Sequence, residues 1–202
     1  MHIYTGYFTS LNNVHYKVII SPKENDGIET EILLSGSQPF VMEIEKGGSP
    51  FEPMRKSTAT INIVSDSYLT EVFSPHPQGT AVYLQNLDEN ITEWRGYLKP
   101  NLYNQPYENC VEEISLEASD ALSALQYLKY ETKNQGVKGI VDFHYLIDFM
   151  CKKIGMPEWY VMLIKSDKEG KKLLPNELIV SEQNFFSSDT DDPWTLETLM
   201  TE

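Results

Sequence analysis

Apolar and polar residues alternate along most of the first two thirds of the chain. In the segment 14–20, Val14, Tyr16, Val18 and Ile20 alternate with more polar neighbours, and this period of two is typical of a strand with one buried face. Similar segments, separated by turns rich in Gly, Pro and Asn, predict further strands. The predicted strands are 2–8, 14–20, 28–34, 40–45, 57–65, 80–85, 91–98 and 111–118. Short strands at this spacing are typical of an antiparallel barrel or sandwich.

A helical period replaces this alternation after the last predicted strand. Ser119 or Asp120 is placed to cap a helix over 121–130. Residues 141–154 predict an amphipathic helix that ends at Gly155. Its expected apolar stripe consists of Phe143, Ile147, Met150 and Ile154. We also expect a helical turn within 67–73, a strand at 160–165 and a helix that begins at Trp194.

These elements predict an α+β fold that is mainly β. Residues 1–130 are expected to form an antiparallel barrel or sandwich that ends in a helix, and residues 131–202 a smaller α+β segment. The helical pattern from Trp194 has neither a cap nor a partner before the sequence ends. We therefore expect the second segment to be the start of a further domain of a longer protein.

The net negative charge of the chain argues against two classes of binding partner, nucleic acids and anionic membranes. The chain has 202 residues and a formal net charge of −14, whereas nucleic acids and anionic membranes are bound by basic faces. Its Lys and Arg residues are scattered, so we expect neither partner. The sequence shows no apolar run of the roughly 18 residues that a membrane span needs, and no signal peptide. Cys110 and Cys151 lack metal-binding spacing and are expected to be free thiols.

Motifs for catalysis or cofactor binding are not found in the sequence. The four histidines lie far apart, which argues against a metal site. The loop 187–192 is rich in Ser and Asp, but it lacks the Gly and Glu that a calcium-binding loop requires at its sixth and twelfth positions. Nucleotide-binding and hydrolase motifs are missing as well. We therefore predict no catalytic, cofactor-binding or metal-binding residues and no enzyme activity.

Two other readings remain open from the residues themselves. Paired carboxylates are sufficient for a glycan hydrolase, and the candidates are Glu93, Glu108, Glu112, Glu113 and Glu117. Exposed aromatic rings would instead suit a carbohydrate-binding module, and the candidates are Trp94, Tyr97, Tyr103 and Tyr107. The strand pattern around Trp94 favours burial, and Gly96 within the same strand indicates a bulge or a close backbone approach. Glu113 and Glu117 are expected on the solvent side of their strand.

Several motifs in order along the chain resemble a family of phage tail proteins from phages and prophages of Bacteroides-like bacteria. They are Pro-Met-Arg-Lys-Ser at 53–57, Trp-Arg-Gly-Tyr-Leu-Lys-Pro at 94–100 followed by Tyr103, Pro106 and Tyr107, Leu-Glu-Ala-Ser-Asp-Ala-Leu at 116–122, the helix 141–154, and Asp-Pro-Trp-Thr-Leu-Glu-Thr-Leu at 192–199. The chain departs from the pattern at Asn101 and Ala121, where the resemblance leads us to expect Asp and Gly.

The resemblance implies a structural role in the tail tip or baseplate hub. Such a protein is made in the bacterial cytoplasm and becomes part of the virion. Its β-domain would assemble with other tail or baseplate proteins and form a homo-oligomeric ring, a trimer or a hexamer. It would contain no cofactor and would not recognise a nucleic-acid sequence.

Overall fold

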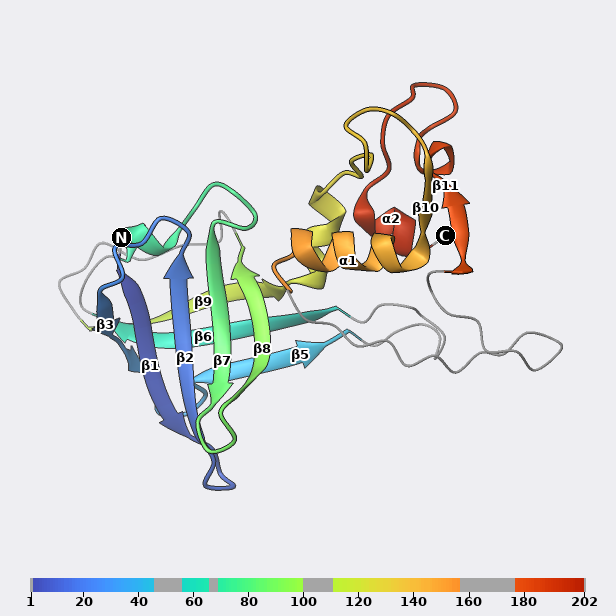
Figure 1. Ribbon diagram of the computed structural model, residues 1–202. Helices are drawn as coiled ribbons and strands as arrows, with labels where there is room; N and C mark the ends of the chain where they lie inside the picture. The colour runs from blue at the N-terminus through green and yellow to red at the C-terminus, as the bar shows by residue number, and fades with distance from the viewer. Residues whose placement is uncertain (1, 46–55, 66–68, 100–110, 157–176, 202) are drawn as a thin grey trace, which may run out of the picture. The chain divides into compact units, whose positions relative to one another are not determined.

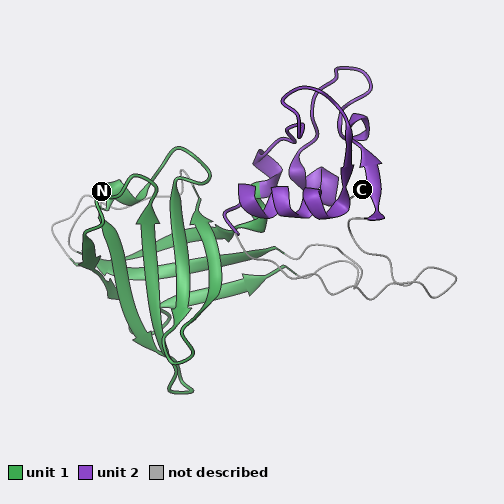
Figure 2. Cartoon of the chain, in the orientation of Figure 1, with its two compact units in different colours: residues 1–124 green, residues 125–202 purple. Residues whose placement is uncertain are grey.

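Two compact units, residues 1–124 and 125–202, make up the chain in the computed structural model (Figure 2). The structure describes residues 2–45, 56–65, 69–99, 111–156 and 177–201. The predicted strand 160–165 and the beginning of the predicted turn 67–73 lie outside these residues. The first unit ends six residues before the boundary that the sequence suggests.

Unit 1 is a nearly closed, barrel-like sheet, and the fold is mainly β as predicted. Within the described residues, nine strands form this sheet, in the order β3-β1-β2-β7-β8-β9-β6-β4, and β5 also pairs with β6 (Figure 1). The strands are β1 (Ile3–Thr9), β2 (His15–Pro22), β3 (Glu29–Glu31), β4 (Leu33–Leu34), β5 (Phe40–Ile44), β6 (Ser57–Ser65), β7 (Thr80–Asn86), β8 (Ile91–Leu98) and β9 (Glu112–Asp120). The short 3-10 helix η1 (Thr70–Val72) lies between β6 and β7. The consecutive strands β7 and β8 pair as an antiparallel hairpin.

The segment 29–34 connects the two ends of the sheet. The sequence predicts one strand over 28–34, whereas the structure divides it into two short strands. Strand β3 runs parallel to β1, whereas β4 pairs antiparallel with β6. Between them the N–H of Ile32 donates to the carbonyl of Thr5 at 2.8 Å. The strand breaks because this short segment leaves β1 in order to join β6.

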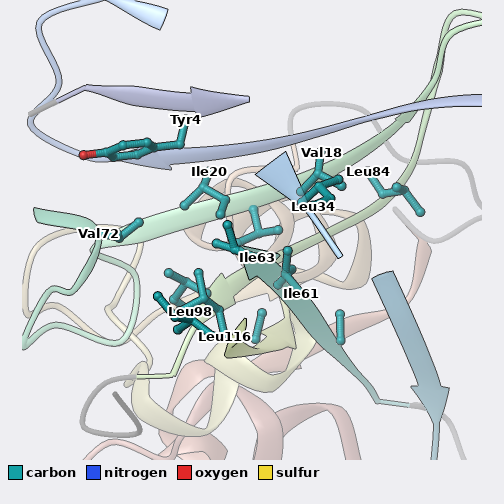
Figure 3. Close-up of a cluster of buried hydrophobic side chains, with 14 of the residues drawn as sticks. Tyr4, Val18, Ile20, Leu34, Ile61, Ile63, Val72, Leu84, Leu98 and Leu116 are labelled. Atoms are coloured by element: carbon teal, nitrogen blue, oxygen red, sulfur yellow. The ribbon is translucent and has the colours of Figure 1, made fainter. Parts of the chain in front are cut away.

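Side chains alternate between the two sides of each strand, and those that point inward fill the interior of the barrel with apolar groups. Figure 3 shows Ile20, Ile61, Ile63 and Leu116 pointing into this shared core. Val18, Ile20, Ile61, Ile63 and Val82 are completely buried. Each such side chain contributes roughly 1.5–3 kcal/mol by leaving water. The core also includes Tyr4, Leu34, Ala59, Leu69, Val72, Leu84, Trp94, Leu98, Ile114 and Ala118.

Gly96 allows the Trp94 ring to lie against the backbone of the barrel wall. Both residues point inward on β8, and a Cβ at Gly96 would collide with the Trp94 ring and with the carbonyl oxygen of Ser119 on β9. The Phe40 ring also packs edge-on against the Trp94 ring, with 5.7 Å between their centroids. The close approach that the sequence indicates at Gly96 is therefore confirmed.

The chain leaves β9 through a 3-10 helix, η2 (Leu122–Tyr127). The sequence predicts a longer helix over 121–130, so the element is correct in position but shorter and tighter than expected. Asp120 caps it, because its Oδ1 accepts hydrogen bonds from the N–H and hydroxyl of Ser123, at 2.8 and 2.7 Å.

Unit 2 contains a small antiparallel pair of strands and several helices. Its elements are β10 (Ile140–Asp142), α1 (Phe143–Lys153), β11 (Ile179–Ser181), the 3-10 helix η4 (Glu182–Phe185) and α2 (Leu196–Thr201). Asp142 caps α1 by accepting from the N–H of Tyr145 at 2.7 Å. Gly155 follows the helix with φ of 72°. Helices near the predicted 141–154 and 194–202 are therefore present.

The buried face of α1 differs from the predicted stripe. Leu146, Met150 and Ile154 are buried, whereas Phe143 is exposed and Ile147 is only half-buried. Phe143 is the first helical residue, and its N–H donates to the carbonyl of Leu178 at 2.9 Å. The junction with β10 and the segment before β11 thus sets the rotation of the helix, which the apolar periodicity alone does not determine.

We expect Gly96→Ala to destabilise unit 1 by about 1–3 kcal/mol, because the added methyl group overpacks the contact between Trp94 and β9. Urea denaturation followed by circular dichroism measures the change. Gly36→Ala is the matched control, since a Cβ at Gly36 meets nothing within 4 Å. Equal midpoints for the two variants would contradict the packing argument.

Candidate functional site

Three of the motifs that carry the family resemblance meet in one hydrogen-bonded cluster in unit 1. Ser57 begins β6, Trp94 lies on β8 and Asp120 ends β9. The Trp94 Nε1 donates to the Ser57 Oγ at 2.9 Å. The hydroxyl and N–H of Ser57 in turn donate to the Asp120 Oδ2, at 3.0 and 2.5 Å. The motifs are thus joined in space although up to 63 residues separate their members.

Both oxygens of Asp120 are engaged, because Oδ1 accepts from Ser123 and Oδ2 from Ser57. Asp120 is 7% exposed and Ser123 6%, so the carboxylate is supplied with donors by the protein rather than by water. A carboxylate held in this way fixes the positions of the strands around it. It presents no unengaged oxygen toward a substrate.

The aromatic candidates for sugar binding do not form an exposed ring surface. Trp94 is buried in the core, as predicted, and Tyr97 is also buried. Tyr97 points to the outer side of β8, where Arg95 hydrogen-bonds to it, and burial raises the pKa of its phenol. Tyr103 and Tyr107 lie outside the described residues. Stacking on a sugar requires an exposed ring face, and neither described ring offers one.

Glu93 and Glu113, two of the carboxylate candidates, are far apart. Leu98 pairs with Ala118 in antiparallel strands, so Glu93 and Glu113 lie near opposite ends of the β8–β9 pair, on the order of 30 Å apart along the strands. A glycosidase needs its two carboxyl groups within roughly 5–9.5 Å. Glu93 accepts from Asn86 Nδ2 at 2.8 Å, and Glu117 pairs with Lys99 at 3.1 Å. Glu108 and the side chain of Glu112 are not among those described.

Metal-binding groups are dispersed in the described part of the chain. Its His, Cys, Asp and Glu side chains do not gather in any group of three or more that would hold a metal ion. His2 contacts Asp26 and His15 contacts Asp88, both near the surface. In the acidic loop 187–192, Asp191 forms an ion pair with Lys138. Cys151 is a free thiol, and Cys110 lies outside the described residues.

The outer side of β1, β2, β7 and β8 has a composition unlike the rest of this acidic protein. Strand pairing places side chains in two neighbouring rows, one of Tyr7, Lys17 and Gln85 and one of Ile19, Tyr83 and Arg95. We call these six residues the tyrosine face. Lys17 Nζ lies 5.8 Å from the Tyr7 ring centroid, and Arg95 Cζ lies 5.2 Å from that of Tyr83.

Carboxylates are instead found on the outer side of β5, β6 and β9. There Glu43 pairs in register with Thr58, and Glu113 and Glu117 alternate with Ser115. We call Glu43, Glu113 and Glu117, with the hydroxyl residues Thr58, Thr60 and Ser115 between them, the acidic face. Glu113 and Glu117 are exposed, which confirms the predicted solvent side of β9. The sequence reasoning missed the contrast between the two faces, because it appears only once pairing order and register are known.

Unit 2 contains its own buried carboxylate, Glu182, which is fully inaccessible. Its Oε1 accepts from the Tyr130 hydroxyl at 2.5 Å and from the Lys133 N–H at 2.8 Å, and its Oε2 accepts from the Gly139 N–H at 2.6 Å. Burial by itself would raise the pKa of the Glu182 carboxyl, but these hydrogen bonds outweigh burial and hold that pKa below its ordinary value of 4.5. Burial and the bond to Glu182 raise the pKa of Tyr130.

Rings surround the Tyr130–Glu182 pair. Tyr130 meets Phe149, Phe185 and Phe186 edge-on, with centroids 5.7, 5.0 and 6.3 Å away. The cluster therefore joins the segment 131–139 to η4 and α1. Sequence reasoning did not single out Glu182, because an isolated Glu before two phenylalanines carries no signal of burial.

Comparisons with known proteins found no relative of the chain. A scan against models of protein families, a search of curated proteins and a search of solved structures each gave no match. Among the described helices, none has the length and apolar character required to cross a membrane.

Replacing Asp120 with Asn is expected to lower the free energy of unfolding of unit 1 by about 2–4 kcal/mol. The side-chain NH2 of Asn would face N–H and O–H groups of Ser57 or Ser123 that donate to the carboxylate. Those buried donors would then be left without an acceptor. Urea denaturation of the full chain measures the loss, and Glu113→Gln on the exposed outer side of the same strand is the control. A loss no larger than that of the control would refute the role of Asp120.

The depressed pKa of Glu182 makes unit 2 sensitive to acid. Its carboxylate contributes stability that is fully present above pH 4.5 and is lost as the pH falls through the lower folded-state pKa. We expect Glu182→Gln to flatten the dependence of unfolding free energy on pH below 4.5, while the exposed control Asp189→Asn retains it. Denaturant titrations at a series of pH values test this, and parallel curves for all three proteins would contradict it.

Proposed function

We propose that the chain is a structural component of a phage or prophage tail, located at the tail tip or baseplate hub. Its β-domain assembles by contacts with further copies and with other tail or baseplate proteins. The observation that carries the proposal is the meeting of residues 57, 94 and 120 in one buried cluster. Motifs that resemble the tail family thus lie where they determine the shape of a subunit, which is what an assembling protein requires.

The interior of the barrel also favours a structural subunit. It is filled by apolar side chains, and the Asp120 carboxylate uses both of its oxygens to hold the wall. The outer sides of the strands differ in charge from one side of the barrel to the other. A domain with a solid core and contrasting outer faces is suited to contacts with neighbours.

The two alternatives have less support. Sugar binding relies on exposed rings, whereas Trp94 and Tyr97 are buried. Glycan hydrolysis relies on two neighbouring acids, whereas Glu93 and Glu113 lie at opposite ends of a strand pair. A structural role requires neither feature, so it is the function that the described residues support best.

Purified particles of the phage or prophage that encodes the chain provide the test. Mass spectrometry is expected to detect the chain in intact particles after gradient purification, and antibody labelling in the electron microscope is expected to place it at the distal end of the tail. Deletion of its gene should yield particles without complete tails, and supplying the intact gene in trans should restore them.

A cytoplasmic host protein measured in the same fractions serves as the control for contamination. A chain that stays in the soluble lysate, together with normal tails in the deletion strain, would overturn the proposed function. Binding of the purified chain to a glycan array would then favour the carbohydrate-binding alternative.

A further inference from the structure

The tyrosine face is free of carboxylates in a chain with 30 Asp and Glu residues. Outward positions on β1, β2, β7 and β8 follow from the buried ones, because Tyr4, Val18, Val82 and Trp94 point into the core. The outward residues are Ile3, Thr5, Tyr7, Thr9, His15, Lys17, Ile19, Ser21, Ala81, Tyr83, Gln85, Thr92, Arg95 and Tyr97. None of these residues is an acid, and Glu93, at the bulge of β8, hydrogen-bonds instead to Asn86 and Tyr16. The four strands are neighbours in the sheet (Figure 1).

Residues of this face have the chemistry of a protein contact. Tyr and Arg are enriched in protein interfaces, where they supply large contact areas at low entropic cost. Tyr7 is 49% exposed, and Lys17, Tyr83, Gln85 and Arg95 are half-buried. Lys17 also pairs with Glu29 of β3 at 3.2 Å, so the face is close to neutral with a positive part at Arg95.

Charge complementarity identifies a second copy of the chain as the occupant. Two copies, each with a net charge of −14, repel one another when their acidic surfaces meet within a Debye length of about 8 Å. The tyrosine face can approach the acidic face without this repulsion, because it opposes Glu43 and Glu113 with tyrosines and cations. Against another tyrosine face it would gain no such opposite charge for Arg95, because Lys17 is already paired with Glu29.

We propose that copies of the chain associate head to tail, with the tyrosine face of one copy against the acidic face of the next. The two faces belong to different strands of the barrel, β1, β2, β7 and β8 on one side and β5, β6 and β9 on the other. A contact between two different faces propagates from copy to copy, and it closes into a ring when the rotation per copy allows it. This inference deepens the proposed tail function, on which the biological role of the ring rests.

Charge exchange between the faces tests the contact on the full chain. Light scattering after size exclusion is expected to show the wild-type chain as a closed trimer or hexamer. Tyr7→Glu with Gln85→Glu places two acids opposite Glu43 and Glu113, and we expect association at least roughly 100-fold weaker, because like charges across an interface are strongly unfavourable. Glu43→Lys with Glu113→Lys should weaken association as well, since it removes the acids that face the tyrosine face and places lysines opposite Arg95.

Rescue is the decisive observation. The chain that carries all four substitutions has acids on one face and lysines on the other, so it is expected to assemble again. If the ring is a hexamer, an equimolar mixture of the two double variants is also expected to assemble, because the variants can then alternate and each copy meets a complementary neighbour. Asn12→Glu with Ser37→Glu adds the same charge at exposed positions outside the strands and should leave assembly unchanged. Circular dichroism confirms that each variant is folded.

A wild-type chain that stays monomeric at high concentration would overturn the head-to-tail contact. So would undiminished association of the Tyr7 and Gln85 variant, or a failure of both rescue experiments. These outcomes are distinct from those of the particle experiment. A chain present in tails but without self-association would remove this contact alone, whereas an assembling chain that is missing from particles would remove the tail function alone.

Discussion

The barrel depends most on the buried carboxylate of Asp120. A carboxylate that is 7% exposed has lost most of its hydration, and it remains stable only because four hydrogen bonds from Ser57 and Ser123 replace the lost water. The Ser57 hydroxyl simultaneously accepts from Trp94. Three strands that are adjacent in the sheet but distant in sequence are thereby fixed relative to one another. The same carboxylate also caps η2.

Unit 2 applies the same physical principle to a different problem. Among its described residues, the segment 131–139 contains no long helix or strand. Glu182 compensates by binding the Tyr130 hydroxyl and the backbone N–H groups of Lys133 and Gly139. A buried acceptor that is fully satisfied orders the backbone around it more specifically than apolar packing does. In unit 2 a carboxylate thus holds a segment without regular secondary structure, whereas in unit 1 Asp120 joins strands that are already paired in the sheet.

Much of the fold follows from the sequence because alternation reports burial directly. The positions of β1, β2, β6, β7 and β8 and of helix α1 are predicted within a few residues. The break at Ile32, the parallel pairing of β3 and the rotation of α1 are not, since each depends on a partner distant in sequence. For the same reason, the three motifs can be found in the sequence, but their contact at Asp120 cannot be predicted from it.

The tyrosine face and the acidic face could not be predicted from the sequence for the same reason. Along any one strand, Tyr7, Lys17 or Glu113 is an ordinary solvent-side residue, and it acquires meaning only when the register places it beside its neighbours. A high net negative charge keeps individual chains soluble and separate. Assembly of such a chain then requires a surface from which that charge has been removed. The tyrosine face on β1, β2, β7 and β8 meets this requirement, because its outward positions contain Tyr, Lys, Gln and Arg and no acid.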